Sequence, residues 1–170
     1  MATGDPVVKI LRITPPAATA AFLTRLAGAS TPAENVLVWN FADGTQNYLD
    51  FLCALEGYDG GGLTFRLGWG SSATTGNVEW ELAVRAIPDD AEDLDTTAHT
   101  YDYNVSAVAV PSAAGEVAYD NITFTDGVDM DSWADATLAI VRLTRNAGAG
   151  NAEDTAAGAA HLHGFWGRET

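Results

Sequence analysis

The sequence offers few of the residues from which covalent or metal-based sites are built. Cys53 is the only cysteine, so the chain can form no intramolecular disulfide, and zinc sites that need paired cysteines are excluded. Its neighbours in the run FLCAL are apolar, which indicates a buried side chain rather than a reactive thiol. The G-x-S-x-G motif is absent, and three scattered histidines indicate no nucleophilic triad. We therefore predict a protein without catalytic residues.

Positive charge is also scarce. Lys9 is the only lysine, and the eight basic residues face 23 acidic ones, for a formal charge of −15 and a pI near 4.2. Such a surface repels nucleic-acid phosphates and anionic lipid headgroups, and no apolar segment approaches the roughly 20 residues that span a bilayer. We predict no direct nucleic-acid partner, no membrane contact and no secretory signal. Salt adaptation and codon bias explain the acidic balance equally well.

The apolar residues that are present alternate with polar ones, which is typical of β-strands. The two clearest runs predict eight core side chains: Leu63, Phe65, Leu67, Trp69, Val78, Trp80, Leu82 and Val84. The small residues 70–76 between these runs indicate a hairpin or a longer loop between paired strands. Eight segments carry strand signals in all: 7–13, 35–41, 63–69, 78–86, 104–110, 117–124, 138–143 and 162–166. This pattern predicts an all-β fold, a single antiparallel β-sandwich of jelly-roll type with about eight strands.

Length and composition predict one such domain over residues 35–170. Residues 1–34 form either an N-terminal strand and arm or part of the same domain, and residues 17–26 read as a short helix or as that arm. Residues 129–135 predict one helical turn begun by an aspartate cap. Residues 89–95 predict an acidic loop, and residues 146–158 a second loop that is mobile unless a neighbour holds it.

Three consecutive glycines, Gly60, Gly61 and Gly62, precede the first clear strand in YDGGGLTFRLGW. A phosphate-binding loop runs from a strand into a helix, whereas these glycines run into a strand and no Gly-Lys-Ser/Thr follows. We expect them to supply positive φ angles or a close backbone passage at a corner of the sandwich.

Several acidic residues and histidines are weak site candidates. Glu79 and Glu81 would point to one side of a strand, where a solvated face is a simpler explanation than a glycosidase pair. Three aspartates, Asp126, Asp129 and Asp131, alternate as calcium ligands do, but the glycine and glutamate of an EF-hand are missing. His161 and His163 alternate too, and we expect an edge or subunit contact because no third metal ligand is identifiable. We predict no metal and no cofactor, with calcium at the three aspartates as a weak alternative.

The five tryptophans have two interpretations. Trp69 and Trp80 keep the apolar phase of their strands, so core packing is the default. Tryptophans on an outer face would instead stack on sugar rings or anchor a protein interface. The second interpretation requires at least two exposed aromatic rings on one face with polar residues beside them.

The order of the motifs resembles a family of small jelly-roll virion proteins of tailed phages and related viruses. The matching segments lie within residues 35–170 and are YDGGGLT with its strand to Trp69, TGNVEW (75–80), ITFT (122–125), MDSW (130–133), RLTRNA (142–147), LHGF (162–165) and RET (168–170). Proteins of that family decorate or cement the capsid, and similar sandwiches occur in head fibres and tails. The resemblance supplies no catalytic residues, and residues 1–34 do not match it.

The resemblance implies a virion structural protein on the outer capsid surface. It would bind the major capsid protein through edge strands and an N-terminal arm, and because symmetry repeats a small contact we expect a homotrimer. The alternative is a carbohydrate-binding jelly-roll module that acts in host-receptor recognition in a head fibre or tail. A third hypothesis is a glycan-active enzyme that uses Glu79, Glu81 or Asp131.

Overall fold

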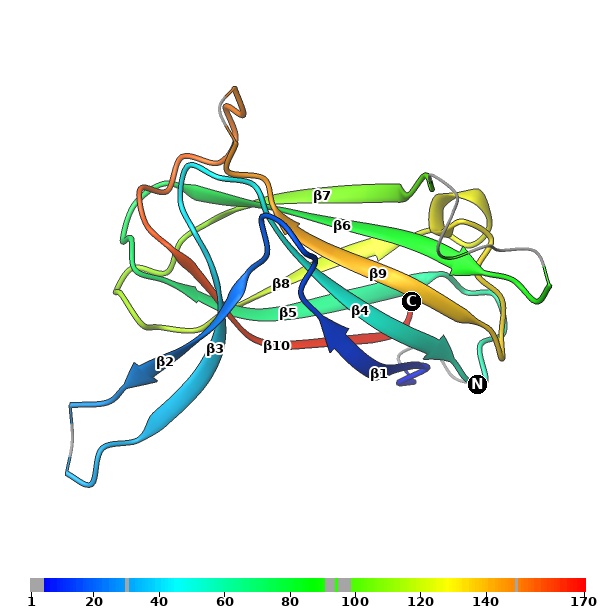
Figure 1. Cartoon of the computed structure of the whole chain (residues 1–170), viewed down its shortest axis with the longest axis horizontal. Coiled ribbons are helices and arrows are strands. Elements are labelled where there is room, and N and C mark those ends of the chain that lie inside the picture. Colours follow the sequence, from blue (N-terminus) through cyan, green and yellow to red (C-terminus); the bar gives the residue numbers. More distant parts are fainter. Residues whose placement is uncertain (1–4, 30, 91–93, 95–98, 149) are drawn as a thin grey trace.

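The computed structural model describes residues 5–29, 31–90, 94, 99–148 and 150–170, and they form an antiparallel β-sandwich (Figure 1). The strands are β1 (Val8–Thr14), β2 (Phe22–Ala27), β3 (Asn35–Phe41), β4 (Asn47–Leu55), β5 (Leu63–Ser71), β6 (Asn77–Ile87), β7 (Asp102–Ala109), β8 (Ala118–Phe124), β9 (Leu138–Arg145) and β10 (Ala160–Glu169). A short 3₁₀ helix, η1 (Val128–Met130), separates β8 from β9. The predicted all-β sandwich is confirmed.

The strands form two five-stranded sheets. Sheet A has the order β1-β4-β9-β6-β7, and sheet B has the order β2-β3-β10-β5-β8. Residues 70–76 join β5 in sheet B to β6 in sheet A, so the expectation that they connect paired strands is wrong. β10 lies in the middle of sheet B and not at an edge.

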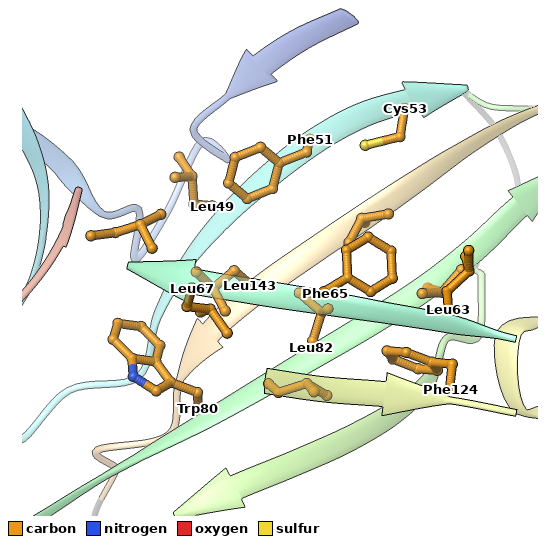
Figure 2. Packing of buried hydrophobic residues seen from close by; sticks show 14 of the residues in the cluster. Leu49, Phe51, Cys53, Leu63, Phe65, Leu67, Trp80, Leu82, Phe124 and Leu143 are labelled. Atoms are coloured by element: carbon orange, nitrogen blue, oxygen red, sulfur yellow. The ribbon is translucent and has the colours of Figure 1, made fainter. Parts of the chain in front are cut away.

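The core fills the space between the sheets (Figure 2). All eight side chains predicted for it are 0% exposed. Aromatic rings hold the layers together: Phe165 stacks on Phe51 and on Phe65, with ring centroids 4.4 and 5.4 Å apart. Because aromatic pairs contribute beyond the area that they bury, these contacts fix how the two sheets lie on each other.

Two strands lie where none was predicted. β2 takes the second half of the segment predicted as a helix or arm, and among the described strands it pairs only with β3. The β2–β3 hairpin extends away from the body of the sandwich (Figure 1). β4 has buried residues at alternate positions, but its outer face carries Leu52 and Ala54, which conceal the alternation in the sequence. The helical turn predicted at 129–135 is shorter and begins earlier: η1 overlaps it only at residues 129 and 130, and its N-cap is Gly127 with no side-chain cap.

The three glycines lie where the chain passes close to other backbone. Gly62 has a φ of +84°, and a Cβ atom there would lie 2.6 Å from the carbonyl oxygen of Phe124. A Cβ on Gly61 would meet the side chain of Glu169 at 3.2 Å. A side chain at either position would have to displace its neighbours, so this corner depends on glycine.

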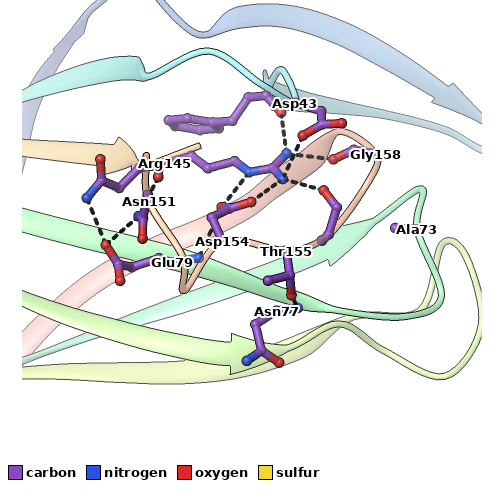
Figure 3. Close-up of polar contacts among 12 residues, drawn as sticks. Asp43, Ala73, Asn77, Glu79, Arg145, Asn151, Asp154, Thr155 and Gly158 are labelled. Atoms are coloured by element: carbon purple, nitrogen blue, oxygen red, sulfur yellow. Dashed lines mark hydrogen bonds and ion pairs between the residues drawn. The ribbon is translucent and has the colours of Figure 1, made fainter. Parts of the chain in front are cut away.

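A buried arginine holds the loop over residues 146–158 (Figure 3). The guanidinium of Arg145 is 0% exposed and donates to both carboxylate oxygens of Asp154, at 2.9 and 2.8 Å. It also donates to the carbonyl oxygens of Ala156 and Gly158, at 2.8 and 2.6 Å. The sequence predicted that residues 146–158 are mobile unless a neighbour holds them, and Arg145 is that neighbour. The acidic loop predicted at 89–95 lies largely outside the described residues.

Within the described part of the chain, no helix is long and apolar enough to cross a membrane.

Candidate functional site

The outer face of sheet B carries exposed aromatic rings around an arginine. Trp166 of β10 is 40% exposed and Tyr119 of β8 is 60% exposed, and their rings meet edge to face with centroids 6.2 Å apart. The guanidinium carbon of Arg66, on β5 between them, lies 4.8 Å from the ring centre of Tyr119 and 5.9 Å from that of Trp166. We call this surface, together with His161 and His163 of β10, the Trp166 face.

Two features of the strands give this face its shape. β10 has an irregular register between Leu162 and Gly164, and such bulges redirect the side chains around them. β5 has glycine at the outward positions 68 and 70. A Cβ on Gly68 would lie 3.2 Å from the ring of Tyr119, and one on Gly70 would lie 3.3 Å from Nε2 of His163 and 2.7 Å from a backbone oxygen. The absence of side chains at these two glycines therefore lets the Tyr119 ring and the His163 imidazole pack closely against β5.

A groove of about 620 Å³ reaches the Trp166 face at His161 and His163. Its wall consists of β10, the β5 end, the β2–β3 hairpin and the segment before β8, with lining residues Arg25, Leu26, Ala27, Gly28, Glu34, Val36, Ser71, Ser72, Ala114, Gly115, Val117, His161 and His163. Hydroxyl, imidazole and charged groups thus lie beside apolar side chains, as in most ligand-binding clefts.

Three buried polar atoms of the Trp166 face have no hydrogen-bond partner in the described part of the chain: Nε of Arg66, Nδ1 of His161 and Nε2 of His163. Burial lowers the pKa of both histidines, and the nearby charge of His163 lowers that of His161 further. Both imidazoles are therefore neutral at pH 7, and each can donate one hydrogen bond and accept another. Unsatisfied buried polar groups are costly, and a ligand recovers that cost only if these side chains turn the buried atoms outward to pair with it.

The other tryptophans are placed differently. Trp69, Trp80 and Trp133 are at most 1% exposed, and Trp39 is half-buried beside the core. The signal in the sequence for Trp166 was local, because His163 and Trp166 break the alternation of the closing strand. The irregular register of β10 accounts for that break.

The outer face of sheet A also carries tyrosines and an arginine, but that arginine is paired with a carboxylate, although the buried Oγ1 of Thr144 on this face has no hydrogen-bond partner among the described residues. Arg142 donates to both oxygens of Asp50, at 2.7 and 2.9 Å, and its guanidinium carbon lies 5.5 Å from the ring centre of Tyr48 and 4.9 Å from that of Tyr101. The hydrogen bonds with Asp50 raise the pKa of Arg142. Tyr103, on β7 of this sheet, is 61% exposed. An aromatic surface with its own internal partners has less need of a ligand.

Glu79 and Glu81 do not form a solvated pair. Glu79 is 8% exposed, and its Oε1 accepts hydrogen bonds from Asn146 and Asn151 at 2.7 and 2.8 Å (Figure 3). Burial raises the pKa of the half-buried Glu81, and the charge of Glu79 raises it further. The interpretation of Glu79 as a solvated residue is wrong, because the loop after β9 covers it.

Each of the three candidate calcium ligands has a partner in the protein. Asp126 accepts a hydrogen bond from the hydroxyl of Tyr58 at 2.6 Å, and Asp129 from the amide of Thr125 at 2.6 Å. Asp131 accepts from the amide of Ala86 at 2.8 Å. No group of three or more His, Cys, Asp and Glu side chains suited to a metal occurs among the described residues.

Comparison with known proteins gives structural likeness only. No protein-family model matches the chain, and no curated protein matches it. Among solved structures, a family 11 carbohydrate-binding module from Clostridium thermocellum in complex with a mixed-linked tetrasaccharide is 10% identical, with a TM-score of 0.45 over 99% of this chain and 96% of that one. A family 16 carbohydrate-binding module is 14% identical, with a TM-score of 0.43 over 77% and 75% of the two chains.

A family 61 carbohydrate-binding module in complex with β-1,4-galactotriose is 9% identical and has a TM-score of 0.40, over 94% of this chain and 88% of that one. All three TM-scores are below 0.5. A function for this chain therefore has to be argued from its own geometry.

Proposed function

We propose that this protein binds carbohydrate on the Trp166 face. The observation that carries the proposal is the combination, on one face of one sheet, of two exposed aromatic rings with three buried polar atoms that have no partner among the described residues. A saccharide presents both kinds of complementary surface. Its C–H groups pack on the negatively charged faces of aromatic rings, and its hydroxyls both donate and accept hydrogen bonds.

Each part of the face has a distinct role in this proposal. Trp166 and Tyr119 form the platform on which a sugar ring packs. Neutral His161 and His163 exchange hydrogen bonds with hydroxyl groups further along the groove. Arg66 is held between the two rings and pairs with no carboxylate of the described chain, so its guanidinium is available for a ring oxygen, a hydroxyl or an acidic sugar.

The opposite faces of the sandwich offer a matched control. Tyr119 on sheet B and Tyr103 on sheet A are 60% and 61% exposed, so replacing either with alanine removes the same ring from a similar environment. We expect Tyr119→Ala to weaken binding of a glycan selected from a panel of neutral and acidic saccharides, by about 0.5–1.5 kcal/mol or up to roughly tenfold in Kd. Tyr103→Ala should leave the Kd unchanged.

Affinity electrophoresis through polysaccharide gels, followed by calorimetry, measures this difference. The proposal would be refuted by a protein that binds no glycan of the panel. It would also be refuted if Tyr103→Ala, and not Tyr119→Ala, abolished binding, which would assign the site to sheet A.

Capsid decoration stays a prediction alongside carbohydrate binding, because the two roles need different surfaces. It is tested by mixing the purified protein with capsids that have been stripped of it. Saturable rebinding that raises the heat resistance of the shells would support it.

A further inference from the structure

The hairpin of β2 and β3 exposes large apolar side chains. Over residues 22–37, which we call the arm, Phe22, Leu23, Val36 and Leu37 are 55%, 53%, 46% and 62% exposed. The arm extends beyond the body of the sandwich (Figure 1). Exposed apolar residues normally occur singly on a soluble protein, so four on one short hairpin indicate a surface that is covered in the assembled protein.

An apolar groove of about 150 Å³ lies at the base of the arm. Leu23 and Leu37 line its arm side, and Ile13 of β1 lines the other side. Its floor includes Phe51 and Leu162, which are 1% and 3% exposed and belong to the core. An apolar side chain from another molecule could therefore contact core residues through this groove.

The strands that border the groove are both sheet edges. β1 pairs only with β4, and β2 pairs only with β3. Leu11 and Ile13 on β1 are 55% and 42% exposed, so both edges are apolar. Natural proteins protect edge strands with charges, prolines or a covering segment, because unpaired backbone groups on an apolar edge recruit other strands.

The distribution of charge along the chain indicates that a second copy of the protein covers the arm and the apolar groove. Residues 1–34 contain three basic and two acidic side chains, whereas residues 35–170 contain five basic and 21 acidic ones. Two copies of the body repel each other strongly, and most other acidic surfaces are repelled as well. The arm with β1 carries three basic side chains and one acidic one, Glu34, so it is the region through which two copies can approach with the least repulsion.

We propose that the arm is a self-association element, in which the arm of one copy covers the arm and the apolar groove of a second copy. A projecting apolar segment and a receptive apolar groove on the same chain form a complementary pair, and repetition of such a contact around an axis closes a ring. The resemblance to jelly-roll virion proteins implies three copies for that ring. This inference is argued from the exposed arm and the apolar groove and not from glycan binding, although His163 lines both this groove and the one of 620 Å³.

Matched substitutions test the contact. Leu37→Asp places a carboxylate on the arm at a residue that is 62% exposed, and Val128→Asp places one on η1 at a residue that is 82% exposed. Both add the same charge at a site that folding does not need to bury, and thermal unfolding checks that each variant is folded. We expect Leu37→Asp to raise the self-dissociation constant at least tenfold and Val128→Asp to leave it unchanged.

Sedimentation equilibrium and light scattering over a range of protein concentrations give that constant, and hydrogen exchange reports whether the amides of β2 become protected as copies associate. The apolar contact should persist or strengthen in high salt, since salt screens repulsion between the bodies. A protein that is monomeric at every concentration and salt would overturn the proposal. So would equal effects of the two substitutions, or an arm that binds a capsid protein while the chain stays monomeric.

Discussion

Replacing Arg145 with methionine should destabilise the fold more than the same substitution at Arg142, which lies on the same strand. The guanidinium is fully buried, and its loss leaves the carboxylate of Asp154, itself 1% exposed, without a counter-charge. It also leaves the carbonyl oxygens of Ala156 and Gly158 without their donor. Removing one partner of a buried ion pair costs about 3–5 kcal/mol, which is a large part of the 5–15 kcal/mol typical of a domain.

Urea unfolding followed by tryptophan fluorescence measures this cost. With a slope of about 2 kcal/mol per molar, the midpoint of Arg145→Met should fall by roughly 2 M. Arg142→Met is the control, because it makes the same substitution three residues earlier on the same strand. The Arg142–Asp50 pair is partly exposed, with side chains 30% and 19% accessible, so its loss should cost about 1 kcal/mol or less.

A double-mutant cycle isolates the pair itself. Adding Asp154→Asn to Arg145→Met removes the unpaired charge and should restore part of the lost stability. If Arg145→Met cost no more than Arg142→Met, the account of Arg145 as the anchor of the 146–158 loop would be refuted.

Three further predictions concern the glycine corner, the histidines and the cysteine. Gly62→Ala should reduce the free energy of unfolding by at least about 1 kcal/mol more than Gly115→Ala. The two glycines have similar φ angles, +84° and +85°, but only at Gly62 would a Cβ atom meet backbone. Equal losses in urea unfolding would contradict this. The folded-state pKa values of His161 and His163 are lowered from 6.5, so their contribution to stability is present above pH 6.5 and is lost as the pH falls below it. The double variant His161→Gln/His163→Gln should therefore flatten the plot of unfolding free energy against pH in that range. Parallel plots for the two proteins would contradict the burial of the imidazoles. Burial raises the pKa of Cys53 to about 12, so a thiol reagent should modify it only as the protein unfolds, and rapid modification in native buffer would contradict that placement.

The fold was largely predictable because alternation records which side of a strand is buried. It was visible where the outer side is polar or glycine, as in the strand ending at Trp69. It was hidden in β4, whose outer side carries Leu52 and Ala54. It was also hidden in β2, which follows an alanine-rich segment and pairs with β3 alone among the described strands. Such pairing is a tertiary effect that local propensity does not report.

From the sequence we could state what a carbohydrate site would require, but not which residues form it. The sequence required two exposed rings on one face, but which aromatic residues meet depends on strand order and register. Tyr119 and Trp166 are 47 residues apart and come together because β8 and β10 both flank β5. The three unpartnered polar atoms depend on the same neighbours, so composition could not identify them.

The footprint of a bound glycan on the backbone tests the proposed function most directly. In a titration followed by backbone amide chemical shifts, the account predicts that the perturbed residues cluster on β5, β8 and β10 around Arg66, Gly68 and His163. Shifts that cluster instead around Glu81 and Arg142 on sheet A, or no shifts with any glycan, would contradict it.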